Sequence, residues 1–265
     1  MNGVTAMPKI IVCYKWVVDE QDIRVNQETQ ELDYSRTKKK ISDYDKNAIE
    51  IGTQIYEKDG GSLVTISYGD GDVKSSLKDA LSRGPEEAFW INDDNAAKAD
   101  SFVTANAVAA AVKKVGDFDM IICADGSSDV GNQQFANRVA ALLDVPAITS
   151  TAELTVDGTT VTAKRRLGDQ FETVSVAGPA VYSVLPEVAT PRFPSIKQLM
   201  GAKKKPQTEF SVADLGLDAA QTTPKAAVST VKGYTMTRKN IVFKDGEVAD
   251  QVKQLAEALA KEGLL

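Results

Sequence analysis

The feature that most constrains the fold is an alternation of strand-like and helix-like segments over the first 150 residues. Near-continuous apolar runs are typical of strands that are buried on both faces, and apolar residues spaced three and four apart predict helices. The predicted strands are 9–15, 62–68, 88–91 and 119–124, and the predicted helices are 45–57, 73–81, 100–115 and 131–145. Such alternation specifies a mostly parallel sheet with helices on its faces, so we expect a doubly wound α/β fold.

The pattern changes after residue 150. Asp157-Gly158 stands between two β-rich segments and predicts a hairpin that leaves the α/β layers. Four prolines punctuate 184–210, which we expect to be an exposed functional loop ending in the solvated run Lys203–Lys205. We therefore divide the chain into an α/β domain at 1–210 and a C-terminal arm and helix at 211–265.

The C-terminal division predicts a partner. Residues 211–240 have no sustained period and many small or polar side chains, which is typical of an arm lying on another surface. At 246–263 the apolar residues Val248, Val252, Leu255 and Leu259 share one stripe of an amphipathic helix. A stripe of this kind needs a surface to cover it, so we expect another subunit there.

Composition excludes several classes of function. The 31 basic and 37 acidic residues give a net charge of −6, which offers no electrostatic support for a nucleic-acid or acidic-membrane role. The absence of histidine excludes Ser-His-Asp and Cys-His catalysis, so we expect a cofactor, not a catalytic side chain, to supply any chemistry. The two cysteines form no Cys-x-x-Cys or zinc motif, and no apolar run approaches about 20 residues, so we expect a cytoplasmic protein without a metal site.

The segment DMIICADGSSDVGNQQFANRVAALL is the most informative for chemistry. Short polar residues follow a buried strand, at the end of the sheet where doubly wound folds bind ligands. Ser127, Ser128 and nearby amides suit phosphate oxygens, and Asp125 and Asp129 suit ribose hydroxyls or a helix cap. An ordinary turn whose serines and aspartates only cap a helix remains the alternative.

Five segments together resemble the electron transfer flavoprotein beta family, in its FixA-type branch. They span residues 9–206 and occur in the family's order: CYKWVVDEQDIRVN, KISDYDKNAIE, LSRGPEEA, CADGSSD and PRFPSIKQLMGAKKKP. The resemblance implies an adenine-nucleotide-binding, Rossmann-like domain whose site draws on four parts of the sequence. Its implied cofactor-binding residues are Cys13, Ser42, Asp43, Tyr44, Asp45, Tyr68, Cys123, Ala124, Asp125, Gly126, Ser127, Ser128, Asp129, Val130 and Gly131.

The resemblance also implies cofactors and partners. The family's beta subunit holds AMP or, in electron-bifurcating members, a second FAD that accepts hydride from NADH. An alpha subunit holds most of the shared FAD, the partner is an acyl-CoA dehydrogenase or CoA-ester reductase, and ferredoxin joins in bifurcating members. Ile196 stands at the position of the aliphatic anchor of the family's recognition loop.

Two departures from the family's pattern leave alternatives open. RLGDQFET keeps Glu172 and Thr173 but lacks the family's glycine pair, and Ser127-Ser128-Asp129 replaces the Asn and Gln types of housekeeping members. The choice between AMP and a second FAD therefore stays open. A stand-alone ATP-binding α/β protein and a structural subunit with a vestigial site are the rival hypotheses, because a fold does not fix a function.

Overall fold

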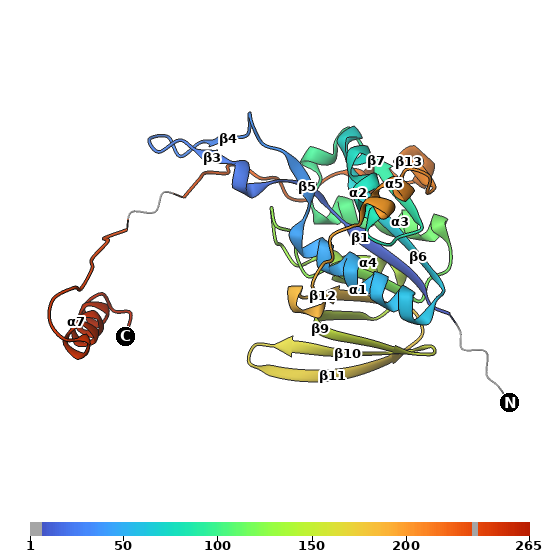
Figure 1. Ribbon diagram of the computed structural model, residues 1–265. Coiled ribbons are helices and arrows are strands. Elements are labelled where there is room, and N and C mark those ends of the chain that lie inside the picture. Colours follow the sequence, from blue (N-terminus) through green and yellow to red (C-terminus); the bar gives the residue numbers. More distant parts are fainter. Residues whose placement is uncertain (1–6, 235–237) are drawn as a thin grey trace. The chain divides into compact units, whose positions relative to one another are not determined.

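The computed structural model describes residues 7–234 and 238–265 (Figure 1). Its contacts divide the chain into two units. The larger contains the residues up to Arg24 together with Tyr34–Thr230, and the smaller contains Val25–Asp33 and Val231–Leu265. The predicted division at residue 210 concerns domains and their partners, and it stays a prediction.

A nine-stranded sheet organises the larger unit, in the order β11-β10-β9-β12-β8-β1-β6-β7-β13. Its strands in chain order are β1 (Lys9–Tyr14), β6 (Ser62–Gly69), β7 (Glu87–Asn92), β8 (Met120–Ala124), β9 (Ala147–Asp157), β10 (Thr160–Leu167), β11 (Gln170–Ala177), β12 (Ala180–Val184) and β13 (Gln207–Ser211). Adjacent strands from β9 to β13 pair in parallel, whereas β10 and β11 add an antiparallel edge. The predicted α/β fold is confirmed.

The connections reverse direction at β1. From β1 the chain builds β6 and β7 on one side, then returns to place β8 on the other side. In parallel sheets such a reversal opens a crevice beyond the carboxyl ends of the two central strands, here β1 and β8. The crevice is where the candidate site is built.

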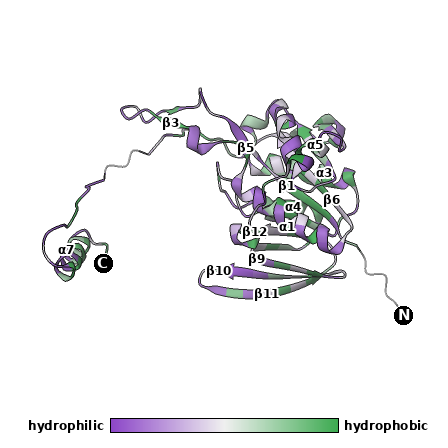
Figure 2. Ribbon diagram, in the orientation of Figure 1, coloured by the Kyte–Doolittle hydropathy of each residue, from purple (hydrophilic) through white to green (hydrophobic). Residues whose placement is uncertain are grey.

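Helices cover both faces of the sheet because side chains alternate along each strand (Figure 1). The helices of the larger unit are α1 (Asp43–Asp59), α2 (Leu77–Ser82), α3 (Ser101–Val115), α4 (Phe135–Leu143), α5 (Ile196–Ala202) and α6 (Ala219–Thr222). Ile10 and Val12 of β1 pack with Ile49 of α1, while Ile11 and Cys13 belong to the core on the α3 and α4 side. Figure 2 shows central strands such as β6 coloured as hydrophobic.

The hairpin at Asp157-Gly158 is confirmed. β9 and β10 pair antiparallel across it, and Gly158 has the left-handed φ of +60° that a tight turn requires. The strand-rich segment that follows does not all stay in the hairpin. β12 returns to the parallel layer, between β8 and β9.

Three sequence expectations differ from the structure. α4 begins at Phe135, not near Gly131, because Gly131 and Gln133 have left-handed φ values of +58° and +55° that no helix accommodates. The expected loop at 184–210 contains helix α5, which a capping box from Ser195 and Gln198 stabilises, and the start of β13. Part of the arm is bound to the α/β layers, since the backbone N–H groups of Lys225 and Ala226 donate to Asp100 at 2.7 and 2.9 Å.

Short two-stranded pairings complete the strands, with β2 (Trp16–Val18) beside β5 (Lys39–Ile41) and β3 (Arg24–Val25) beside β4 (Leu32–Asp33). In the smaller unit the backbone N–H of Gly233 donates to the carbonyl of Gln30 at 2.7 Å. The predicted amphipathic helix is confirmed as α7 (Val248–Lys261), with Val248, Val252 and Leu255 exposed. Among the residues described, no helix has both the length and the apolar character needed to cross a membrane.

Candidate functional site

Two buried cysteines lie at this end of the sheet. The parallel register that aligns Val12 with Ile122 continues toward Cys13 and Cys123, near the carboxyl ends of β1 and β8. Burial raises the pKa of the Cys13 thiol to about 12 and also raises the pKa of Cys123, so both stay neutral thiols. Their place among core side chains supports a packing role.

The first turn of α1 joins the two strands. Ser42 accepts a hydrogen bond on its Oγ from the backbone N–H of Ser128 at 3.2 Å. The carboxylate of Asp45, only 6% exposed, accepts from the backbone N–H of Lys15 at 2.8 Å. Burial raises the pKa of Asp45 to about 7, against the opposing effect of hydrogen bonds from the backbone of Lys15 and Ala124. The structure thus brings the predicted segments 42–45 and 123–131 together.

Lys15 is a candidate site residue that the sequence analysis missed. Its Nζ lies 2.6 Å from Oδ2 of Asp129 in the loop after β8. Burial alone would raise the pKa of Asp129, but hydrogen bonds from Lys15 and Ser127 outweigh it and lower the pKa, so the carboxylate stays charged. The signal available in the sequence was position, because Lys15 directly follows the central strand at the point where the sheet reverses.

The loop after β8 holds an unpartnered hydroxyl. Oγ of Ser128 is shielded from solvent and has no hydrogen-bond partner among the described residues. A buried polar group without a partner costs about 1–3 kcal/mol. The loop folds closely on itself there, since a Cβ on Gly126 would lie 3.3 Å from Cα of Gly131. A polar ligand in the crevice would supply the missing partner.

Both carboxylate oxygens of Asp125 already accept hydrogen bonds from this chain. Its Oδ1 accepts from Oγ of Ser183 at 2.6 Å and from the backbone N–H of Ser150 at 3.3 Å, and its Oδ2 accepts from Nε2 of Gln133 at 2.7 Å. These bonds tie the loop to β12 and β9. The predicted ribose-binding role of Asp125 stays a prediction, and the contacts show it as an organiser of the loop.

The remaining predicted residues lie in other surroundings. The hydroxyl of Tyr68 donates to Asp93 at 2.7 Å, and its ring packs on the core of the α3 side. The carboxylate of Asp43 accepts from Lys40 and Lys46, each at 2.7 Å. The side chains of Tyr44 and Val130 are exposed. None of these contacts joins the Lys15, Asp45 and Asp129 network.

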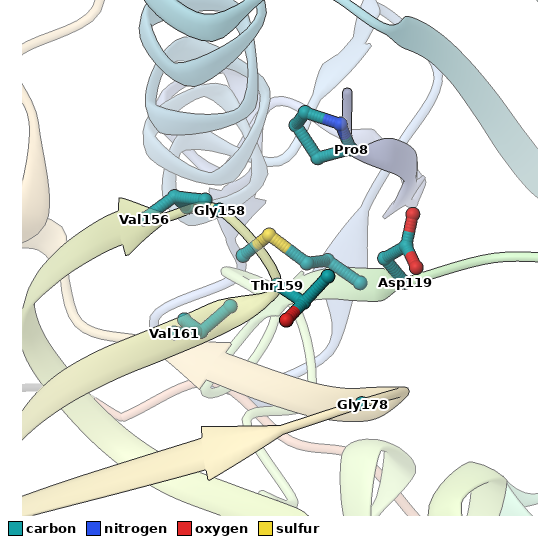
Figure 3. Close-up of a pocket in the computed structure, with 8 residues that line it drawn as sticks. Pro8, Asp119, Val156, Gly158, Thr159, Val161 and Gly178 are labelled. Atoms are coloured by element: carbon teal, nitrogen blue, oxygen red, sulfur yellow. The ribbon is translucent and has the colours of Figure 1, made fainter. Parts of the chain in front are cut away.

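At the opposite end of the sheet the described residues enclose a small hollow. A hollow of about 20 Å³ lies at the amino ends of β1 and β8, beside Pro8, Asp119, Thr159 and Gly178 (Figure 3). A cavity of that volume has room for about one water molecule.

An exposed apolar tip lies in the proline-rich segment. Ile196 is the first residue of α5 and is 78% exposed, and Phe193 is 97% exposed. The sequence predicted that the lysine run behind the tip is solvated, but Lys205 is bound by the protein. Nζ of Lys205 donates to the carbonyls of Leu81, Gly84 and Pro85 at 2.9, 3.2 and 2.6 Å, because these groups follow or end α2 and lack helical partners.

A comparison with protein families decides the identity. The model of the electron transfer flavoprotein domain matches residues 31–215, which is more than half of the chain. The chain belongs to the electron transfer flavoprotein family. The matched range contains the first turn of α1, the loop after β8 and the exposed tip, while Cys13 and Lys15 precede it. Electron transfer flavoproteins generally bind flavin.

Proposed function

We propose that the protein is the beta subunit of a heterodimeric electron transfer flavoprotein. It carries electrons by way of FAD between a donor, NADH or a flavin dehydrogenase, and a partner of the acyl-CoA dehydrogenase or reductase type. The observation that carries the proposal is the crevice of a family member with a buried, unpartnered hydroxyl at Ser128. The FixA-type segments of the sequence support the choice of subunit.

The crevice suits an adenine nucleotide, either AMP or the ADP half of a second FAD. The Ser128 hydroxyl and the Lys15 ammonium are the groups that would bind phosphate oxygens, because one has a free hydrogen bond and the other a positive charge. A Cβ on Gly126 would lie 3.3 Å from Cα of Gly131 and 3.6 Å from Cγ of Gln133, so this turn of the loop leaves little room for a side chain at 126. The flavin supplies the redox step, and the residues of this chain bind and orient the cofactors.

Two surfaces fit the proposed partners. The stripe of Val248, Val252 and Leu255 on α7 suits the alpha subunit, since exposed apolar helix faces are typical of subunit interfaces. Ile196 suits the redox partner as a single aliphatic anchor with the charged Lys197 beside it. A stand-alone ATP-binding protein would need neither surface.

The cofactor content of the complex tests the proposal. The chain would be purified with a co-expressed alpha subunit, and FAD and AMP would be extracted and quantified per heterodimer. One FAD and one AMP support the simple electron carrier. Two FAD and little AMP support the bifurcating type and make NADH-dependent ferredoxin reduction the next assay. A complex with neither nucleotide in the crevice would contradict the site assignment, and a stable monomeric ATPase would contradict the carrier.

A further inference from the structure

A buried carboxylate lies under the exposed tip. Glu50 belongs to the second turn of α1 and is 4% exposed. Its oxygens accept from Nε of Arg192 at 2.6 Å, from the backbone N–H of Arg192 at 3.2 Å and from Nε2 of Gln54 at 2.7 Å. A buried charge is stable only when it is paired and hydrogen-bonded. Glu50 therefore holds both the side chain and the backbone of Arg192, whose Nη1 also pairs with Glu57 at 3.0 Å.

A second contact fastens the same segment one turn earlier on α1. Nδ2 of Asn47, which is also buried, donates to the carbonyls of Pro186 and Ala189 at 2.9 and 2.7 Å. Arg192 is flanked by Pro191 and is followed within two residues by Pro194, whose rings restrict the backbone φ. The chain from 186 to 192 therefore enters the tip along a fixed path.

The apolar side chains of the tip pack little against their own chain. Phe193 follows Arg192 directly and Ile196 begins the next helix, and both side chains point apolar area at solvent. An exposed anchor binds more tightly when its backbone is already held in the bound conformation, because less ordering entropy is lost on binding. Arg192 is the residue next to Phe193, so its bonds to Glu50 supply such order.

We propose that Glu50 is a positioning residue, which holds Phe193 and Ile196 in place for the redox partner by fixing Arg192. The inference rests on the proposed function, since it assumes that the tip contacts that partner. Glu50 acts through Arg192, which its two carboxylate oxygens hold. The matching surface on the partner is an apolar pocket that admits one aromatic and one aliphatic side chain.

The test compares Glu50→Gln in two backgrounds, wild type and the double variant Phe193→Ala with Ile196→Ala. Each protein is purified as the complex with its alpha subunit and reduced by a purified acyl-CoA dehydrogenase. In the wild-type background we expect Glu50→Gln to raise the KM for the flavoprotein about tenfold at unchanged kcat and cofactor content, as for loss of a docking hot spot. In the double-variant background Glu50→Gln should have no further effect on KM, because the two side chains that Glu50 positions are already removed.

The matched control is Glu187→Gln. Glu187 lies in the same segment and pairs with Arg166 at 2.7 Å, but both side chains are partly exposed, so the same chemical change should leave KM unaltered. If Glu50→Gln does not fold, Arg192→Ala replaces it and Arg192→Lys should restore part of the effect. Equal effects of Glu50→Gln in both backgrounds, or none in either while Phe193→Ala with Ile196→Ala raises KM, would overturn the inference. An unchanged KM for that double variant would instead contradict the proposed docking role of the tip.

Discussion

Neighbouring turns of helix α1 support the crevice and the tip, but they hold polar groups at the crevice and apolar side chains at the tip. At the crevice, Ser42 and Asp45 of α1 hold charged and polar groups partly out of water. At the tip, Asn47 and Glu50 hold backbone so that apolar side chains stay in water. The crevice should therefore respond to pH and to single polar atoms. The tip should respond chiefly to apolar area.

The largest expected effect is a pH dependence that belongs to Asp45. Its pKa is near 3.8 in the unfolded chain and about 7 in the folded protein, so the neutral acid is the form that folding favours. Its contribution to stability is full below pH 3.8 and is lost as the pH rises to about 7. A shift of that size corresponds to about 4 kcal/mol in the free energy of unfolding.

Urea unfolding at several pH values would measure this contribution against Asp45→Asn, whose amide does not titrate. The stability of the wild type relative to Asp45→Asn should fall between pH 4 and 7 and stay level above that. Carboxylates with lowered pKa values, such as Asp129, act in the opposite direction at lower pH, and they cancel in the comparison. A constant difference between the two proteins would show that Asp45 is not titrating in the crevice.

The next effect belongs to the tip. Ile196→Ala should weaken docking to an acyl-CoA dehydrogenase by about 2 kcal/mol, or roughly thirtyfold in Kd, as expected for a hot-spot anchor. Its melting temperature should not change, because the side chain is exposed and packs on little of its own chain. Titration calorimetry of the complex would measure the affinity. Leu167→Ala, which removes another exposed aliphatic side chain at the end of β10, is the control.

The smallest expected effect is that of removing one atom, Oγ of Ser128, which should change ligand binding but not folding. Ser128→Ala should weaken nucleotide retention by about 1 kcal/mol, the value of one hydrogen bond, while leaving the folded chain as stable or slightly more stable. The sign follows because Oγ of Ser128 has no partner among the described residues. Nucleotide release on dilution and thermal unfolding would measure the two quantities. A clear loss of stability would reveal a protein partner and weaken the crevice as a ligand site.

Much of the fold was predictable because local pattern and burial agree. The apolar runs of β1 and β8 and the Asp157-Gly158 turn each specify their structure within a few residues. Helix α4 was predicted four residues too early, since apolar spacing cannot reveal the left-handed backbone at Gln133. Glycine at 131 permits that conformation, but a glutamine gives no comparable signal.

The candidate site was predictable only in its parts. Ser42, Asp45 and the loop after β8 are brought together, and the sequence pointed to each of them. The ion pair of Lys15 with Asp129 and the hydrogen bonds of Lys205 join residues more than a hundred positions apart. The spacing of apolar residues relates only residues within one helix or strand. Contacts between distant parts of the sequence are therefore found only in the folded structure.

The strand order also dictates a sequence of events during synthesis. β12 lies between β8 and β9, yet it is made after both of them and after the whole hairpin. The two earlier strands cannot bond to each other in the native arrangement, so that half of the sheet stays open until residue 184 has left the ribosome. Until then β8 and β9 each keep an unpaired edge, and a nascent chain stalled before β12 should be the form most in need of a chaperone.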